Sequence, residues 1–238
     1  PYLHFGELSP NQVWHAVNNF AVLENIETQA EHFHRELFWR EFSYSLIHYF
    51  PDLTYRNLNR RFDDFPWKKN DQFIKKWRTG MTGYPLIDAG MRELASTGYM
   101  HNRVRMITAS FLVKNLLIDW RSGAQWFWES LVDADLANNS CSWQWVAGSG
   151  ADAAPYFRIF NPVTQSKKFD PDAKYIRRWI TELEKCPNKY IHDPSSAPES
   201  ELQHFGIKLD QTYPSAIVDL KTSREAALRA YQSLKGRS

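Results

Sequence analysis

The chain has 238 residues, of which 43% are hydrophobic and 15% aromatic, and its formal net charge at pH 7 is +2. This length and apolar content favour a soluble globular protein that buries a substantial core. The low net charge excludes binding to nucleic acid through bulk positive charge, so any such role must depend on a local basic face.

Helix signals dominate the N-terminal half of the chain. Ser9 and Pro10 form an N-cap and first-turn pair, which predicts a helix from this point. A second helix is expected from about Glu31 to Phe50, because Pro51 prevents its continuation. Further helices are predicted over residues 71–77, 85–98, 102–119 and 124–136.

The longest apolar stretch, residues 104–118, is interrupted by Arg105 and Lys114. It is also shorter than a membrane span needs to be. This stretch therefore indicates a buried core helix, and no membrane is expected as a partner.

The C-terminal half carries fewer helix signals. Asp170, which is followed by proline, predicts the start of one helix. Residues 187–214 are proline-rich and polar, which favours an irregular surface segment. A last helix is predicted from a capping box of Thr222 and Glu225 to Gly236.

No segment alternates apolar and polar residues with period two, and no repeat of fixed length is visible. The expected fold is therefore all-α, a single multi-helix domain over residues 1–238. No predicted strand is followed by a glycine-rich loop, so neither a Rossmann nor a P-loop nucleotide site is expected.

A mixed polar and aromatic stripe lies on the predicted second helix. Glu36, Trp39, Arg40 and Ser43 stand at positions i, i+3, i+4 and i+7, which places them along one face. A carboxylate, an indole and a guanidinium on one stripe could cradle a flat aromatic ligand. The alternative, which the residues alone favour, is an exposed glutamate and arginine beside a packed tryptophan.

The same geometry recurs in Asn102, Arg105 and Met106. Arg105 lies in an otherwise apolar run and, if buried, needs a carboxylate or phosphate partner. Asp133 and Asp135 are plausible carboxylates. A purely structural salt bridge is an equally good interpretation.

An acidic segment, 133–135, leads into Asn138 and Asn139 and then into Trp143 and Trp145. Small polar residues between acids and tryptophans suit a site where backbone and amides approach a planar cofactor. An ordinary helix C-terminus followed by a turn explains the asparagines equally well.

The spacing of the histidines and cysteines does not indicate a metal site or a disulfide scaffold. His32, His34 and His101 lack a matching cysteine or carboxylate pattern, so no metal site is expected. Cys141 and Cys186 form no C-x-x-C pair, which excludes a disulfide scaffold and an all-cysteine iron–sulfur site. This cysteine usage favours a reducing, intracellular compartment.

Several long motifs run through the chain. They are LHFGELSP at 3–10, ELFWREF at 36–42, TGYPLIDA at 82–89, MHNR at 100–103, DADL at 133–136, WQW at 143–145 and FNP at 160–162. In these motifs the chain resembles the DNA photolyase and cryptochrome family over essentially its whole length, in particular bacterial class I-type cyclobutane pyrimidine dimer photolyases. The resemblance implies the helical FAD-binding domain of that family.

The resemblance implies a U-shaped FAD whose flavin is lined by residues 133–135, with Arg105 as the ionic partner of Asp133. Asn139 stands where photolyases place an asparagine against the flavin nitrogen that is protonated on reduction, whereas plant cryptochromes have an aspartate. The cofactor contacts implied in this way are Phe33, Arg40, Tyr99, Asn102, Arg105, Asp133, Ala134, Asp135 and Asn139.

Three tryptophans match the family's electron-transfer chain, in which Trp143 is nearest the flavin, Trp120 follows and Trp67 lies at the surface. Packing alone is the alternative for each of them. With these three, Glu36 and Asn139 complete the catalytic residues that the resemblance implies.

Contacts to DNA and to the lesion also follow from the resemblance. They are Glu36, Trp39, Arg40, Ser43, Asn102, Arg103, Met106, Trp145, Arg158 and Gln165, with Lys167 and Lys168 as further phosphate contacts. Enzymes for (6-4) photoproducts have a histidine where this chain has Asn102, and plant cryptochromes generally lack the equivalents of Glu36, Trp39 and Met106.

The implied function is light-driven repair of cyclobutane pyrimidine dimers in DNA, with reduced FAD as the active form. The alternative is a cryptochrome-type blue-light sensor that binds flavin and repairs nothing. A third interpretation is an inert apo fragment.

The chain begins at Pro1 without a methionine, which suggests a fragment of a longer protein. The resemblance places the segment that binds the FAD pyrophosphate, and an α/β antenna domain with a second chromophore of unknown identity, before that residue. A monomer without an obligate protein partner is expected, in the cytoplasm and associated with the nucleoid of a bacterium.

Overall fold

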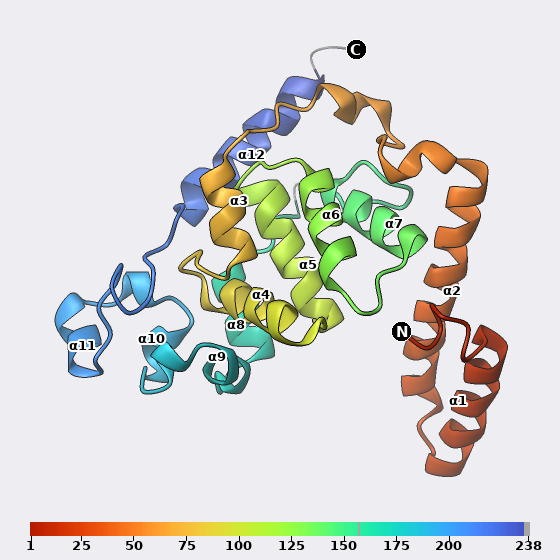
Figure 1. Cartoon of the computed structure of the whole chain (residues 1–238), viewed down its shortest axis with the longest axis horizontal. Helices are drawn as coiled ribbons and strands as arrows, with labels where there is room; N and C mark the ends of the chain where they lie inside the picture. The colour runs from red at the N-terminus through yellow and green to blue at the C-terminus, as the bar shows by residue number, and fades with distance from the viewer. Residues whose placement is uncertain (157, 236–238) are drawn as a thin grey trace.

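A computed structural model describes residues 1–156 and 158–235, and helices build this part of the chain (Figure 1). The α-helices are α1 (Pro10–Glu24), α2 (Glu27–Tyr49), α3 (Asp71–Arg78), α4 (Pro85–Thr97), α5 (Asn102–Ser110), α6 (Trp120–Ser130), α7 (Leu136–Ala147), α8 (Pro162–Phe169), α9 (Lys174–Trp179), α10 (Asn188–Ile191), α11 (Glu199–His204) and α12 (Leu220–Lys235). The short elements are the 3-10 helices η1 (Pro51–Thr54), η2 (Arg60–Asp64), η4 (Thr181–Leu183) and η5 (Pro194–Ser196) and the π-helical segment η3 (Phe111–Asn115).

Within the described ranges there is no β-strand, only an isolated bridge between Leu209 and Tyr213. The all-α prediction is therefore confirmed. No described helix combines the length and the apolar character that crossing a bilayer requires.

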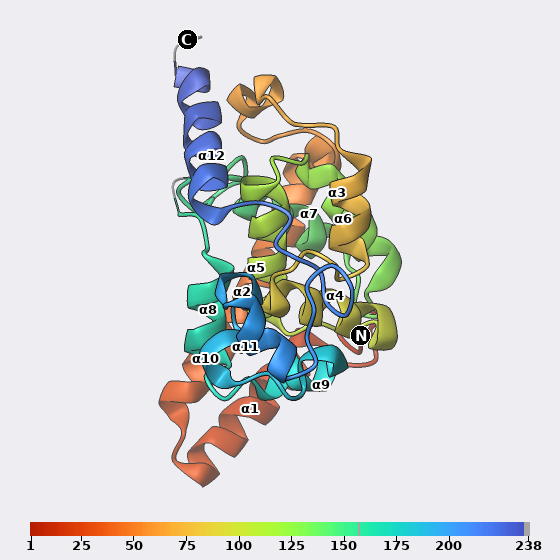
Figure 2. The ribbon, with the colours of Figure 1, turned by 90° about the vertical axis from the view of Figure 1, so that its left-hand side faces the viewer.

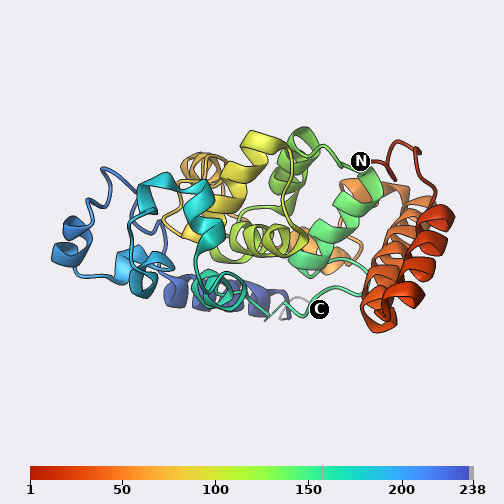
Figure 3. The same ribbon diagram turned by 90° about the horizontal axis from the view of Figure 1, so that it is seen from below.

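The molecule has three parts along its long axis. Helices α1 and α2 form an arm at one end, α3 to α8 form the body, and α9 to α11 form a lobe at the other end (Figure 3). Helix α12 runs along the outer edge of the body (Figure 2) and packs against η3. The arm is joined to the body where α2 packs against α7 and η1.

The core of the body is an aromatic cluster around α4 to α7, in which Trp77 and Trp120 are fully buried. Helix α6 comes so close to α7 that a Cβ on Gly123 would lie 2.1 Å from Cη2 of Trp143. Only glycine permits this approach. Gly123 thus sets the distance between the two helices on which much of the cavity described below depends.

The motif at 82–89 builds a buried junction. The Asp88 carboxylate is fully buried and accepts hydrogen bonds from the Thr82 backbone N–H at 2.7 Å, the Thr82 hydroxyl at 2.6 Å and the Gly83 N–H at 3.0 Å. The hydroxyl of Tyr213 donates a fourth at 2.6 Å. Asp88 therefore ties α4 to the end of the C-terminal lobe.

Several helix boundaries differ from the predictions for local reasons. The helix predicted over 102–119 is shorter in the structure, where it consists of α5 followed by η3 and ends at Asn115. It cannot continue because Leu117 adopts a left-handed backbone with φ of 57°. The helix predicted over 124–136 is α6, which begins at Trp120 because the Asp119 side chain accepts a hydrogen bond from the Arg121 N–H, and which ends at Ser130. Helix α2 begins at Glu27, before the predicted Glu31.

In the C-terminal half, residues 187–214 hold the short helices α10 and α11 and are not wholly irregular. The last helix begins at Leu220, with Asp219 accepting a hydrogen bond from the Thr222 N–H at 2.7 Å, so Thr222 is not the cap. The predicted stop at Gly236 lies outside the described residues.

The ammonium group of Lys114 lies inside the body. The residue is 1% exposed, and Nζ donates to the Arg158 carbonyl at 2.8 Å and lies 5.3 Å from the centre of the Tyr156 ring. Burial, together with the nearby Arg158 guanidinium, lowers the pKa of Lys114 to about 8. The charged form is therefore less favourable in the folded chain than in the unfolded one.

This difference predicts a pH-dependent stability. Between a folded pKa of about 8 and an unfolded value of about 10.4 the unfolded chain binds more protons, so the free energy of unfolding rises with pH by up to roughly 3 kcal/mol. Urea unfolding at pH 7.5, 9 and 10 should show this rise, and Lys114→Met should flatten it. Parallel pH profiles for the two proteins would contradict the assignment.

Candidate functional site

An open cavity of about 390 Å³ lies between the arm and the body, within the size range of small-molecule sites. Its walls come from α2, α5, residues 131–135, α7 and residues 150–151. The predicted site residues that line it are Glu36, Trp39, Ser43, Asn102, Arg105, Met106, Asp133, Ala134, Asp135, Asn139, Trp143 and Trp145. Residues far apart in the sequence are thus brought to one place.

Helix α2 supplies one wall with the predicted stripe. Trp39 is 47% exposed, which contradicts the alternative of a packed tryptophan at this position. Ser43 is buried, and its hydroxyl donates to the Trp39 carbonyl at 2.9 Å. An exposed indole at a cavity mouth offers an apolar face to a planar ligand.

Arg40 does not line the cavity, although it belongs to the same predicted stripe. Its guanidinium pairs with Glu41, donates to the Leu3 carbonyl at 3.4 Å and lies 4.7 Å above the Tyr44 ring. In this conformation the cation holds the N-terminal segment against α2.

The wall that includes α5 carries an ion pair between Arg105 and Asp133, one of the two carboxylate partners that the sequence predicted for Arg105. Arg105 Nη2 donates to Asp133 Oδ2 at 2.9 Å, and Arg105 Nε donates to the Met100 carbonyl at 2.6 Å. The guanidinium lies 5.6 Å from the centre of the Tyr99 ring, which supports it from outside the cavity. The other oxygen, Asp133 Oδ1, is buried and has no hydrogen-bond donor among the described residues.

Asp135 is the N-cap of α7, whose presence the sequence did not predict. The asparagines at 138 and 139 therefore begin a helix, and the interpretation of a helix C-terminus was wrong. Asp135 accepts hydrogen bonds from the Asn138 N–H at 2.9 Å and its amide at 2.6 Å, and also from Tyr44 and His4. Burial raises the pKa of Asp135, but these hydrogen bonds outweigh burial and hold it below the ordinary value.

Asn139 follows on the first turn of α7. Its side-chain amide nitrogen donates to the Ala124 carbonyl at 2.8 Å. This bond uses one of the two N–H groups and fixes the orientation of the amide, and the amide oxygen is the atom that can accept a hydrogen from a bound group. The residue is half-buried and lines the cavity.

The predicted tryptophan chain shares one core. Trp143 is 2% exposed and forms part of the cavity wall, Trp120 is fully buried, and the partly buried Trp67 packs against the same cluster. Trp120 Nε1 donates to Asn57 Oδ1 at 2.9 Å. Trp77 was not among the predicted site residues, although the centre of its ring lies 6.3 Å from the centre of the Trp143 ring.

The remaining predicted residues lie outside the cavity lining. Phe33, Tyr99 and Arg158 are exposed and Gln165 is half-buried, and none of the four lines the cavity. Arg103 lies next to Asn102 and stacks 4.8 Å above the Phe169 ring at the end of α8. Neither the half-buried Arg103 nor the exposed Arg158 is part of the cavity lining.

Sequence reasoning missed other lining residues, including Phe42, Leu46 and Cys141. Phe42 and Leu46 continue the α2 stripe at i+3 and i+7 from Trp39, so the same periodicity could have found them. The residues on α7 required that helix to be predicted. Within the described ranges no cluster of three or more His, Cys, Asp or Glu side chains could hold a metal.

Comparison with known proteins places this site in a family. A family model described as the FAD binding domain of DNA photolyase matches residues 33–233. A deoxyribodipyrimidine photo-lyase of Agrobacterium fabrum is 53% identical over 235 residues, which cover 99% of this chain and 49% of that protein.

Two solved structures share the fold. A bacterial class III photolyase from Agrobacterium tumefaciens has a TM-score of 0.95 and 53% identity, over 99% of this chain and 49% of that one. A cryptochrome from Synechocystis has a TM-score of 0.90 and 38% identity, over 97% and 47% of the two chains. The first is of class III, whereas the motifs alone resembled those of class I-type enzymes.

The chain spans about half the length of these relatives. The family model covers well over half of the chain itself, including the cavity-lining residues of α2, α5 and α7. The chain therefore belongs to the family of the FAD-binding domain of DNA photolyases and cryptochromes.

Proposed function

We propose that this chain provides the cofactor and lesion site for light-driven repair of cyclobutane pyrimidine dimers in DNA. The observation that carries the proposal is the cavity, in which Glu36, Trp39, Asn102, Met106 and Trp145 lie on the walls together with residues 133–135 and Asn139. Recognition groups for a lesion and groups suited to a flavin thus border the same space.

The polar groups of the cavity fit FAD. Asp133 Oδ1 is a buried acceptor with no donor among the described residues, and Arg105 fixes the other oxygen of this carboxylate. The Asn139 amide, fixed by Ala124, presents an oxygen that can accept from a protonated ring nitrogen. Bound FAD in its reduced form would supply a light-excited electron donor.

The lesion is proposed to enter between α2 and α7. A pyrimidine dimer stacks poorly, so turning it out of the duplex costs less than extruding a normal base. Trp39 and Trp145 would contact its apolar faces, while Glu36 and Asn102 hydrogen-bond the pyrimidine edges. The cavity residues orient the dimer and exclude water from it.

Phosphate contacts are proposed from basic groups outside the cavity lining. Arg103 and Arg158 are exposed or half-exposed, and α8 adds Gln165 and the pair Lys167 and Lys168. Such contacts position DNA without reading its sequence. We also propose that the protein acts on DNA as a monomer inside the cell.

A second candidate is a blue-light sensor without repair activity, because the fold is shared with a Synechocystis cryptochrome. Fold alone does not decide between the two functions. The side chains favour repair, since Glu36, Trp39 and Met106 are all present on the cavity walls.

Repair is tested with the FAD-loaded protein and a thymine-dimer oligonucleotide under near-UV to blue light, with a dark control. We expect Glu36→Gln to reduce light-dependent loss of dimers by about tenfold or more, because hydrogen bonds to charged groups contribute roughly 1.5–3 kcal/mol. Glu31→Gln, exposed on the same helix, should repair like the parent. Dimers left intact in the light by the parent protein would overturn repair and favour the sensor.

The tryptophan chain makes a separate prediction. If Trp143 passes electrons from Trp120 and Trp67 to the cavity, Trp143→Phe should abolish most of the light-driven reduction of bound oxidised FAD in the presence of an external thiol. Trp128→Phe, at an exposed position of α6, the helix that also carries Trp120, is the matched control. Flavin absorbance under steady illumination measures both, and equal rates in the two variants would exclude Trp143 as the nearest donor.

A further inference from the structure

The cavity lies at a joint between two parts of the molecule. One wall, α2, belongs to the arm, whereas α5, α7 and residues 131–135 belong to the body (Figure 1). The spacing of the walls therefore depends on the contacts that hold α2 against α7. Among them is a hydrogen bond from Tyr44 on α2 to one cavity residue, Asp135.

Asp135 receives donors from two distant segments. The Tyr44 hydroxyl on α2 donates to Oδ2 at 2.5 Å, and His4 Nδ1 lies 3.2 Å from the same oxygen. The other oxygen, Oδ1, accepts from the backbone and amide of Asn138. Asp135 is 8% exposed, so these donors replace water around a nearly buried carboxylate.

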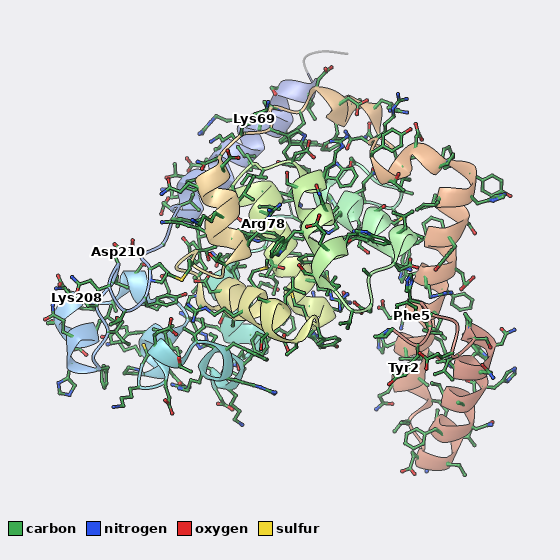
Figure 4. All side chains as sticks on the ribbon, in the orientation of Figure 1. Tyr2, Phe5, Lys69, Arg78, Lys208 and Asp210 are labelled. Atoms are coloured by element: carbon green, nitrogen blue, oxygen red, sulfur yellow. The ribbon has the colours of Figure 1, made fainter. Side chains whose placement is uncertain are left out.

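Tyr44 is itself held in place. The Arg40 guanidinium lies 4.7 Å above its ring and reaches the Leu3 carbonyl at 3.4 Å. The N-terminal segment, marked by Tyr2 and Phe5 in Figure 4, lies on the side of the arm that faces the body. Burial and the Asp135 carboxylate raise the pKa of Tyr44, so its hydroxyl stays protonated and donates.

The two aspartates of the 133–135 segment therefore differ. Both oxygens of Asp135 are engaged by the chain, whereas Asp133 Oδ1 has no donor among the described residues. Asp133 is the carboxylate with an acceptor to spare for a ligand. Asp135 joins the arm to the body.

We propose that Tyr44 and His4 are positioning residues that hold Asp135 and thereby fix the α2 wall at the spacing in which the cavity binds its planar flavin cofactor. The inference rests on the proposed placement of FAD in this cavity. Without these bonds α2 would have to be ordered when the ligand binds, and that ordering consumes part of the binding free energy. The affinity for FAD is the quantity that the joint controls.

A double-mutant cycle tests this inference. FAD affinity is measured by fluorescence titration for the parent protein, Tyr44→Phe, Asp135→Asn and the double variant. We expect Tyr44→Phe to raise the Kd roughly tenfold in the parent background, and to change it less than about twofold when Asp135 is already Asn. Tyr49→Phe, a 75% exposed tyrosine on the same helix, should bind FAD like the parent.

The histidine gives an independent readout that does not depend on Asp135→Asn folding. His4→Ala should raise the Kd about two- to fivefold, and His4→Gln, which retains a donor, should restore it. A Tyr44→Phe protein that binds FAD as tightly as the parent would overturn the inference, as would equal effects of Tyr44→Phe in both backgrounds. Thermal unfolding of each apo variant separates a loss of stability from a loss of affinity.

The outcome is distinguishable from a failure of the repair proposal. At saturating FAD, Tyr44→Phe should repair dimers at the parent rate per bound flavin, because the joint acts on affinity. If the parent protein binds FAD but repairs nothing, the repair proposal fails. The double-mutant cycle of FAD affinity still decides the role of Tyr44 in that case.

Discussion

Helix α7 has to fit two neighbours at once, and the cavity depends on that fit. Towards α6, Gly123 approaches Trp143 so closely that no side chain can stand at position 123. Towards α2, the Cys141 thiol lies 3.9 Å from the Ser43 carbonyl. Because protein interiors are close-packed, a shift of α7 towards either neighbour would displace both walls of the site. The position of this one helix therefore sets the space that a ligand finds.

Hydrogen bonding gives different roles to Asp133 and Asp135, the two carboxylates of one motif. Asp133 is held on one side by Arg105 and keeps a buried oxygen without a donor among the described residues. Asp135 receives hydrogen bonds from Tyr44, Asn138 and His4, which keep its pKa low despite burial. A carboxylate that is satisfied by its own chain serves as a joint, while one with a free acceptor is suited to a ligand.

Repair and light sensing share this architecture, since a photolyase and a cryptochrome both superimpose closely on the chain. The choice between them rests on the side chains at the cavity mouth and not on the fold. An exposed Trp39 beside Glu36 on α2, opposite Asn102 and Met106 on α5, offers apolar faces and hydrogen-bonding groups to a bulky base. These groups explain why the repair proposal is stronger than the sensor.

Local chemistry by itself determined most of the helices, because caps and breakers such as Ser9 and Gly98 act within one turn. It also indicated a carboxylate partner for Arg105, since an unpaired buried charge is costly. The residues considered alone left both Asp133 and Asp135 as candidates for this partner. The tertiary structure shows that the partner is Asp133. Helix α7 escaped prediction because its polar first turn has no apolar period and packing on α6 and α2 stabilises it. Two of the donors to Asp135, Tyr44 and His4, come from 91 and 131 residues away, separations that no local pattern encodes.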